Sequence, residues 1–404
     1  MHLPRVRSLP CGNTSSWLVC LAMLMVLTGW AAAEEPAGWQ MGEPIALDGV
    51  SVKLSRPVLV ARSSGYLWFP TLAKLSDGRI LATMSNYADK HVAVSTSAQA
   101  FSDDGGLTWS KPSTALFCDV HLRLPNGDEM FLPYYMQPSP DGGMTAPFQI
   151  YRAASQSVEP IEKGLSVSGW PRPDKGFAPE LGLSGFVFSG QAVELPDQGY
   201  LATLYGWFEG DKRFSLVAAE SADGKKWKIR STIAGPECRL PGWEGPCEAA
   251  LCRLKDGRLL CVYRLAGYVP LGQSFSSDEG RTWTSPQPMK GPFSVQPSLA
   301  AFPSGRLALS GGRPGVVLWL NLDGQALDWQ AVDLQAHHDA CHPKEPITTG
   351  LERTSSYTEV IATGEGEGLV IYDRIPKGWR EIPADSPDTN SVWVVRFEAE
   401  TSTP

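Results

Sequence analysis

The stretch FSDDGGLTWS, Phe101 to Ser110, places two acids, two glycines and a tryptophan within ten residues. Related stretches are FSSDEGRTW at 275–283, ESADGKKW at 220–227 and the degenerate NLDGQALDW at 321–329. Asp can accept hydrogen bonds from the backbone of its own turn, Gly supplies positive φ, and Trp can pack between sheets. Because the pattern recurs, it predicts a structural turn rather than a catalytic or metal-binding pair of acids. The turn acids are Asp104, Asp223 and Asp278.

Each of these stretches follows an apolar strand, a polar turn that contains glycine and a second apolar strand, which is the signature of a hairpin. Six such hairpins occur along the chain, and their turn glycines lie 48 to 72 residues apart, close to the length of a four-stranded blade. They are Gly78, Gly127, Gly199, Gly257, Gly305 and Gly366. The repeat predicts an all-β fold, a six-bladed β-propeller that spans residues 56–400. Radial packing of blades buries both faces of each sheet, which explains the near-continuous apolar strands.

The N-terminus has the three-part layout of a secretory signal peptide. Arg5 and Arg7 precede an apolar run from Trp17 to about Thr28, and small residues follow before Glu34. We therefore predict a signal peptide at 1–33, an N-terminal segment at 34–55, and a secreted or periplasmic protein that has no membrane attachment after cleavage. A retained N-terminal anchor is the alternative.

Composition excludes one class of partner and leaves the cysteines open. The 404-residue chain has a net charge of −8 with 19% charged residues, which provides no basic face for nucleic acid. In the hairpin CRLKDGRLLC, a two-residue turn at Asp256 and Gly257 would place Cys252 opposite Cys261, at a spacing compatible with a disulfide. Two reduced, buried thiols are the equal alternative.

The pattern Ser-x-Asp-x-Gly-x-Thr-Trp, interleaved with six hairpins, resembles the Asp-box of the sialidase (neuraminidase) superfamily from about Arg56 to the final strand SVWVVRFEAE. The resemblance implies an exported, exo-acting and retaining glycoside hydrolase that removes a terminal acidic sugar such as sialic acid. On the segments PCEAALCRLKDGRLLCVYR and SSYTEVIATGEGEGLVIYD it implies Tyr357 as the nucleophile and Glu248 as its base. Sialidases differ from most glycosidases in their use of a Tyr nucleophile, and a phenol needs such a base because its pKa is high. The acid/base that the family places after the first hairpin corresponds to Asp89, whose alternative role is that of a solvated turn residue.

The family holds the substrate carboxylate with three arginines, whose planar guanidinium groups suit that task. Arg264 matches the second and Arg313 is a plausible third, with ordinary ion pairs as the alternative for both. The first arginine is missing, because LWFP at 67–70 has Trp68 in its place. An aromatic side chain there favours stacking on a sugar, so this departure weakens the implication of an acidic substrate.

In a propeller the first strand of every blade lines the central axis. The residues at the start of each hairpin should therefore meet at one end of this axis, which we call the mouth. We therefore expect a glycan to contact the side chains of Trp68, His121, Gln191 and Gln296 as well as the two arginines. The stretch AHHDACHPKE at 336–345 gathers potential zinc ligands, but its spacing matches no standard site. We expect a loop that supplies one His to the mouth, and no metal or cofactor. The alternatives are a non-catalytic propeller that binds glycans or proteins, and a related hydrolase or lyase that acts on a different sugar.

Overall fold

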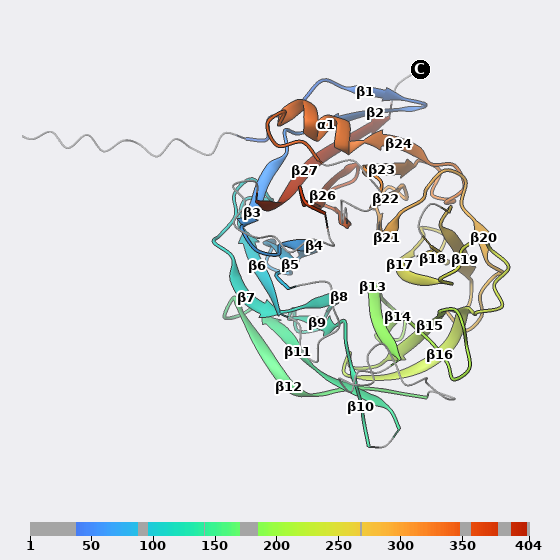
Figure 1. Cartoon of the computed structure of the whole chain (residues 1–404). Coiled ribbons are helices and arrows are strands. Elements are labelled where there is room, and N and C mark those ends of the chain that lie inside the picture. The colour runs from blue at the N-terminus through green and yellow to red at the C-terminus, as the bar shows by residue number, and fades with distance from the viewer. Residues whose placement is uncertain are drawn as a thin grey trace, which may run out of the picture. The chain divides into compact units, whose positions relative to one another are not determined.

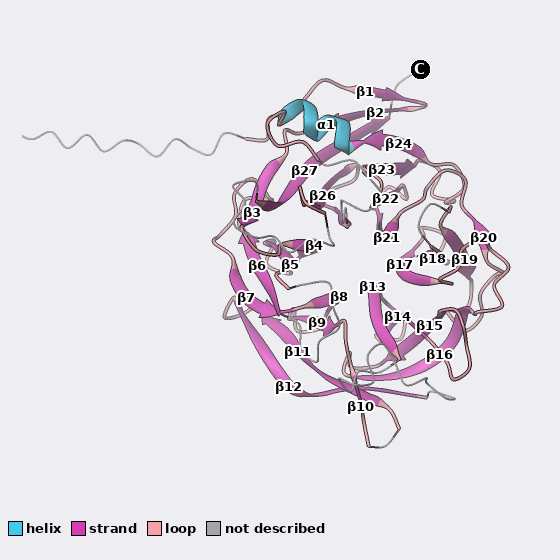
Figure 2. Ribbon diagram, in the orientation of Figure 1, coloured by secondary structure: helices cyan, strands magenta, loops and turns pink. Residues whose placement is uncertain are grey.

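The computed structural model describes residues 38–87, 96–140, 142–169, 185–266, 269–347, 357–378 and 389–401. The predicted signal peptide and Asp89 lie outside these residues. The part from Gly38 onward forms one compact unit. It is built almost entirely from strands, which form the six blades of a β-propeller (Figures 1 and 2). In the described part of the chain, no helix is long and apolar enough to cross a membrane.

The first three blades are antiparallel sheets whose first strands face the centre of the ring (Figure 1). The first blade contains β4 (Trp68–Lys74), β5 (Ile80–Ser85), β6 (Thr96–Ser102) and β7 (Ser113–Leu116). The second contains β8 (Cys118–Arg123), β9 (Glu129–Pro133), β11 (Met144–Arg152) and β12 (Ser157–Ser168), with the short β10 (Gln137–Pro138) beside β11. The third contains β13 (Phe186–Glu194), β14 (Tyr200–Gly206), β15 (Ser215–Ser221) and β16 (Lys226–Ala234). Parallel pairing of β12 with β16 joins the outer edges of the second and third blades.

The other three blades complete the ring. The fourth contains β17 (Cys247–Arg253), β18 (Leu259–Arg264), β19 (Gly272–Ser276) and β20 (Gln287–Pro288). The fifth contains β21 (Val295–Ala301), β22 (Leu307–Gly312), β23 (Val316–Asn321) and β24 (Gln330–Asp333). The sixth contains β25 (Thr358–Ala362), β26 (Glu367–Arg374) and β27 (Asn390–Thr401), and its outer strands are β2 (Val50–Leu54) and β3 (Val58–Ser63), with β1 (Ile45–Leu47) paired to β2.

The sixth blade joins the two ends of the propeller sequence. Both β2 and β3 pair antiparallel with β27, so strands from the beginning and the end of the described chain share one sheet. Backbone hydrogen bonds therefore close the ring. Residues 50–54 belong to this sheet, although we expected the propeller to begin at residue 56.

Side chains on both faces of the blades are buried, as the apolar strands predict. On β13, Phe186 and Phe188 pack into the core between the second and third blades, whereas Val187 packs into the core between the third and fourth. Neighbouring residues of a strand point to opposite faces, so a strand between two cores must be apolar at every position. The described residues form six hydrophobic clusters, one between each pair of adjacent blades.

The repeated acidic stretches are turns, as predicted, and each joins the third and fourth strands of its blade. Asp104 accepts hydrogen bonds from the Ser102 hydroxyl at 2.8 Å and from the Thr108 amide and hydroxyl at 2.9 and 2.6 Å. Asp278 repeats these contacts with Ser276 and Thr282 at the same three distances. The carboxylates are thus occupied by their own turns.

The hairpin that contains Cys252 and Cys261 differs from our expectation. The Leu254 amide donates to the Arg258 carbonyl, and the turn between them has three residues instead of two. The additional residue shifts the register by one, so Cys252 lies opposite Leu260 and Cys261 opposite Leu251. A shift of one residue moves a side chain to the other face of the sheet. The two thiols accordingly lie in different cores, and both are free.

Residues 336–341 of the histidine-rich stretch belong to a helix, α1 (Leu334–Cys341), rather than to the loop we expected. Asp333 caps its first turn by accepting a hydrogen bond from the Ala336 amide. His338 is fully buried, where one ring nitrogen bonds the Tyr372 hydroxyl at 2.9 Å and the other bonds the Glu345 carbonyl at 3.0 Å. These contacts anchor the helix to β26. The described residues contain no group of three or more His, Cys, Asp or Glu that could hold a metal ion.

Candidate active site

The mouth of the axis is built by irregularities at the beginning of the innermost strands. β4, β17 and β21 each contain a bulge or register shift near their first residues, and β13 contains one between Ser189 and Val193. Positive φ angles occur at these places, at Phe69 (48°), Glu248 (40°) and Gln296 (23°). Residues other than glycine rarely adopt such angles, and the strain they store is typical of functional sites. The bulges re-aim side chains away from the regular alternation of the strand.

Gly190 occupies the corresponding place on β13, with a φ of 76°. A Cβ atom at this position would lie 1.9 Å from the carbonyl oxygen of Ala249 on the next blade. The third and fourth blades therefore approach each other here more closely than any other residue would allow. This approach holds β17, and with it Glu248, at the mouth.

Tyr357 and Glu248 lie together, although 109 residues separate them in the chain. The Tyr357 hydroxyl donates a hydrogen bond of 2.9 Å to Glu248 Oε1. Arg264 Nη1 contacts both carboxylate oxygens of Glu248 at 3.0 and 2.9 Å. The backbone amide of Gln296 donates to Glu248 Oε2 at 2.9 Å. Burial of Glu248 favours a raised pKa, but the charge of Arg264 and these hydrogen bonds outweigh it and lower the pKa of this carboxyl. Glu248 is thus held as an anion beside a phenol.

Two further side chains pack against Tyr357. The guanidinium carbon of Arg313 lies 5.3 Å from the centre of the Tyr357 ring, within the range of a cation–π contact. The Phe69 ring meets the same ring edge-on, with 4.5 Å between the centroids. Arg313, which follows β22, also has a positive φ of 50°. The nucleophile candidate is thus fixed on several sides.

The structure reveals a second carboxylate that we did not identify in the sequence. Arg264 Nη2 donates to Glu244 Oε1 at 3.0 Å, so Arg264 bridges Glu244 and Glu248. Burial raises the pKa of Glu244, Arg264 opposes this shift, and the charge of Glu248 adds to it. The sequence signal is the pair of acids four residues apart in EGPCE, separated by the turn formers Gly245 and Pro246.

Tyrosines from the second and third blades lie near Glu248. Tyr134 and Tyr205 share a hydrogen bond between their hydroxyls, and Tyr135 meets Tyr134 edge-on at 4.8 Å. Burial, with smaller effects from neighbouring Tyr side chains and the negative charge of Glu248, raises the pKa of both hydrogen-bonded tyrosines well above its usual value. Both phenols therefore stay protonated, and because Tyr205 is only 4% exposed, the pair is part of the packing near Glu248.

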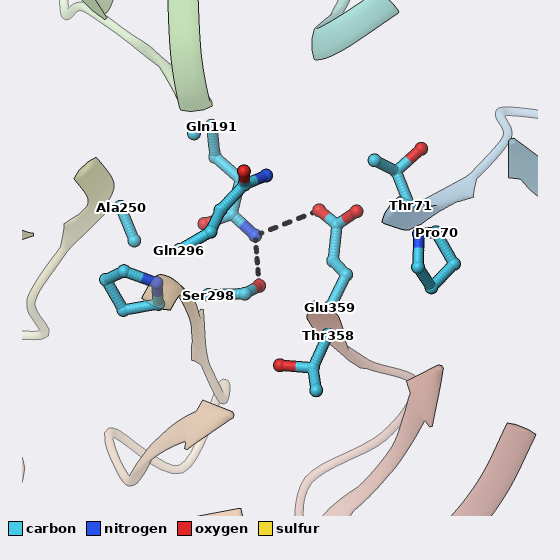
Figure 3. A pocket seen from close by; sticks show the side chains of 10 residues that line it. Pro70, Thr71, Gln191, Ala250, Gln296, Ser298, Thr358 and Glu359 are labelled. Carbon is cyan, nitrogen blue, oxygen red and sulfur yellow. Dashed lines mark hydrogen bonds between the residues drawn. The ribbon is translucent and has the colours of Figure 1, made fainter. Parts of the chain in front are cut away.

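Below the mouth, the axis holds a small pocket lined by polar side chains (Figure 3). Gln191 reaches across it, and its amide nitrogen lies 3.4 Å from Ser298 Oγ and 3.5 Å from Glu359 Oε1. The other Glu359 oxygen accepts the Leu72 amide at 2.7 Å. The Gln191 side chain therefore bonds other blades in the axis. The Gln296 side chain also lines this pocket.

Two residues that we expected to contact a ligand at the mouth, Trp68 and His121, lie elsewhere. Trp68 is 1% exposed, and its indole nitrogen donates to the Tyr87 carbonyl at 2.8 Å, so it is closed to a ligand in this structure. Its neighbour Phe69 holds the bulge position instead. His121 lines a different pocket, with Arg123, Glu129 and Tyr200, and burial lowers its pKa to about 4. Asp89 lies outside the described residues.

The arrangement at the mouth has a definite chemical capacity. A buried carboxylate within 2.9 Å of a phenol can accept its proton as the oxygen attacks an electrophilic carbon. Arg264 and Arg313 bring positive charge to the same place, and Phe69 supplies an apolar face. The described part of this mouth has the components of a covalent catalytic site.

No protein family model matches the sequence, and neither does any protein of curated function. Solved structures share its fold. A protein of unknown function from Dyadobacter fermentans DSM 18053 is 16% identical, with a TM-score of 0.65 over 88% of this chain and 100% of that one. The Hadza microbial sialidase Hz136 is 14% identical, with a TM-score of 0.56 over 83% and 65%. An α-L-arabinanase from Penicillium chrysogenum, complexed with arabinobiose, is 16% identical, with a TM-score of 0.56 over 84% and 97%.

Proposed function

We propose that this protein is an exported glycoside hydrolase that uses Tyr357 as its nucleophile and Glu248 as the base. The observation that carries the proposal is the hydrogen bond of 2.9 Å from the phenol to the buried carboxylate at the mouth of the axis. The sialidase and the arabinanase that share the fold lend support, because both names denote enzymes that cleave glycosides. Fold alone does not determine function, so the proposal depends on the site.

The proposed reaction proceeds in two steps with retention. The Tyr357 oxygen attacks the anomeric carbon while its proton passes to Glu248, and the bond to the leaving group breaks. An acid, for which Asp89 is the candidate, protonates the departing oxygen. Water then loses a proton to the deprotonated acid and attacks the anomeric carbon of the glycosyl–tyrosine intermediate, which releases the sugar, and the Tyr357 oxygen takes its proton back from Glu248. Arg264 keeps Glu248 anionic and correctly oriented for this role.

The terminal acidic sugar that the resemblance implies, such as sialic acid, needs arginines to hold its carboxylate. Arg264 and Arg313 both lie beside the Tyr357–Glu248 pair. Against this substrate, the position of the first arginine holds the buried Trp68, and Arg264 is bonded to two carboxylates of the protein. We therefore propose glycoside hydrolysis as the function and treat the sugar as a separate question.

The test is a panel of fluorogenic glycosides that includes sialosides, uronides and uncharged pentosides and hexosides. We expect turnover of at least one, a loss of about 10²–10⁴-fold in kcat for Glu248→Gln, the usual contribution of a proton-transfer partner, and at least as large a loss for Tyr357→Phe, which removes the nucleophile. Trapping and mass spectrometry of the modified Tyr357 peptide would identify the covalent intermediate directly.

Matched control variants separate chemistry from structure. Tyr200→Phe removes a phenol that donates to the Arg123 carbonyl at 2.8 Å, and Glu129→Gln changes a buried carboxylate paired with Arg123 at 2.8 Å. Neither contact involves the mouth, so both variants should keep full activity. If the wild type turns over no glycoside but binds a glycan equally well with and without Tyr357 and Glu248, the protein is a binding propeller and the proposal is wrong.

A further inference from the structure

Glu244 stands where a ligand anion would bind Arg264. The two terminal nitrogens of this arginine are divided between carboxylates of the protein, with Nη1 on Glu248 and Nη2 on Glu244 at 3.0 Å. Both side chains of the Glu244–Arg264 pair are mostly buried, with 15% and 13% exposed. In a site shielded from water, such charge-assisted hydrogen bonds are strong and specific in direction. The Glu244 carboxylate therefore pairs with Nη2, the terminal nitrogen of Arg264 that Glu248 does not contact.

The loop that carries Glu244 is fixed by contacts with the third blade. Arg213 donates to the carbonyls of Cys238 and Gly242 at 2.9 and 2.8 Å, and the Phe214 amide donates to the Glu244 carbonyl at 2.8 Å. Gly245 has a φ of 90°, and a Cβ atom there would lie 2.7 Å from the Phe214 nitrogen. These contacts hold the backbone of Glu244 on both sides. Its carboxylate is positioned before any ligand arrives.

The charges at the mouth also disfavour an anionic ligand. Arg264 and Arg313 face Glu244 and Glu248, which leaves the four groups with no net charge. A substrate carboxylate that approached Arg264 would have to displace Glu244 and leave this buried anion unpaired, and it would meet the negative charge of the displaced group. Unpaired buried charges and like charges in close contact are both costly.

We propose that Glu244 is a specificity-determining residue that takes the place of a substrate carboxylate on Arg264, so that the site accepts an uncharged sugar and rejects acidic ones. This inference rests on the proposed function only for the statement that the bound sugar is a substrate. The exclusion of acidic sugars is a property of binding and can be measured without turnover.

The experiment measures binding by isothermal titration calorimetry at neutral pH, with 2-deoxy-2,3-dehydro-N-acetylneuraminic acid as the acidic probe. Wild type is compared with Glu244→Gln, which keeps the shape of the side chain, and with Glu244→Ala. The control is Glu279→Gln in the same blade, where the carboxylate is paired with Arg253 through bonds of 3.0 and 2.6 Å away from the mouth. Thermal unfolding verifies that each variant is folded, and if Glu244→Ala does not fold, the isosteric variant decides.

We expect the two Glu244 variants to bind the acidic probe about 10- to 100-fold more tightly than wild type, the effect of making one charge-assisted bond available. The control should not differ from wild type, and Arg264→Lys in the Glu244→Gln background should abolish the gain. No gain in the Glu244 variants, or tight binding of the probe by wild type, overturns the inference.

Turnover tests the proposed function separately. Wild type is assayed with 4-methylumbelliferyl α-L-arabinofuranoside and with the corresponding N-acetylneuraminide. Preference for the neutral glycoside that shifts toward the acidic one in Glu244→Gln supports both proposals. A gain in probe binding without turnover of any glycoside leaves Glu244 as the determinant of ligand charge and removes the hydrolase.

Discussion

The amide of Phe69 donates a hydrogen bond to the carboxylate of Asp373, with 3.1 Å between the nitrogen and Oδ2. Phe69 belongs to β4 of the first blade and Asp373 to β26 of the sixth, so the bond spans the closure of the ring. Asp373 is 1% exposed. Since the Phe69 ring packs on Tyr357, the same contact that joins the two blades also positions one wall of the proposed active site.

Replacing Asp373 with Ala should weaken both closure and catalysis. The partly buried amide of Phe69 would lose its acceptor, so we expect the free energy of unfolding to fall by about 1–3 kcal/mol. Displacement of Phe69 should also lower kcat/KM. Urea unfolding and the glycoside assay measure the two effects. The control is Asp323→Ala, since Asp323 is exposed and accepts the Gln325 amide in its own turn, and we expect a change below about 0.5 kcal/mol. Equal losses in the two variants would contradict this role of Asp373.

The fold was predictable because its signals are local. Each hairpin and each acidic turn is encoded within about twenty residues, and the repetition of these units along the chain indicated the blades. The pairing of β2 with β27 was missed, since it joins segments from opposite ends of the described chain and neither strand has a turn that specifies its partner. The register of Cys252 and Cys261 depended on one additional turn residue, which composition alone did not reveal.

Within the site, only the residues whose position follows from the strand pattern could be predicted from the sequence. Glu248 and Tyr357 open the innermost strands of two blades, and closure of the ring brings such positions together. A bulge in β4 decides which of two adjacent aromatic residues is buried, so Trp68 lies inside while Phe69 contacts Tyr357. Glu244 lies in a loop whose path is set by contacts with the third blade, and no periodicity in the sequence encodes them.

Loss of a turn acid should affect stability and not activity. The hydrogen bonds from Thr282 and Ser276 lower the pKa of Asp278 to about 2. A carboxyl whose pKa is depressed in the folded state stabilises the protein above its ordinary pKa, and the contribution disappears as the pH falls toward the folded value. Wild type should therefore be more stable than Asp278→Asn at neutral pH, and this difference should vanish near pH 2. Urea unfolding against pH measures it, and reduced kcat in folded Asp278→Asn would contradict a purely structural turn.

The decrease of kcat/KM at acidic pH, which is the acidic limb of the pH–rate profile, should report the protonation of Glu248. A base acts only when it is deprotonated, and the pKa of Glu248 is lowered by Arg264 and by its hydrogen bonds against the effect of burial. We expect kcat/KM to persist below the ordinary glutamate value of about 4.3. In Arg264→Gln the positive charge that lowers the pKa of Glu248 is gone, so the acidic limb should move to higher pH. Arg253→Gln, which alters the distant pair with Glu279, should leave the limb in place. A limb that does not move in Arg264→Gln would exclude Glu248 as the titrating base.

Binding of acidic sugars should depend on pH through Glu244. The charged groups that face this carboxyl are Arg264, Glu248 and Arg313, and burial raises its pKa despite the two arginines. Glu244 therefore takes up a proton at a higher pH than Glu248, and in its neutral form it releases Arg264 to an incoming carboxylate. We expect the affinity of wild type for the acidic probe to increase as the pH is lowered from about 7 toward the ordinary carboxyl range near 4 to 5. In Glu244→Gln no proton can be taken up at this position, so its affinity should be high throughout and nearly constant. Calorimetric titrations at several pH values measure both curves, and parallel curves for the two proteins would show that Glu244 does not control access to Arg264.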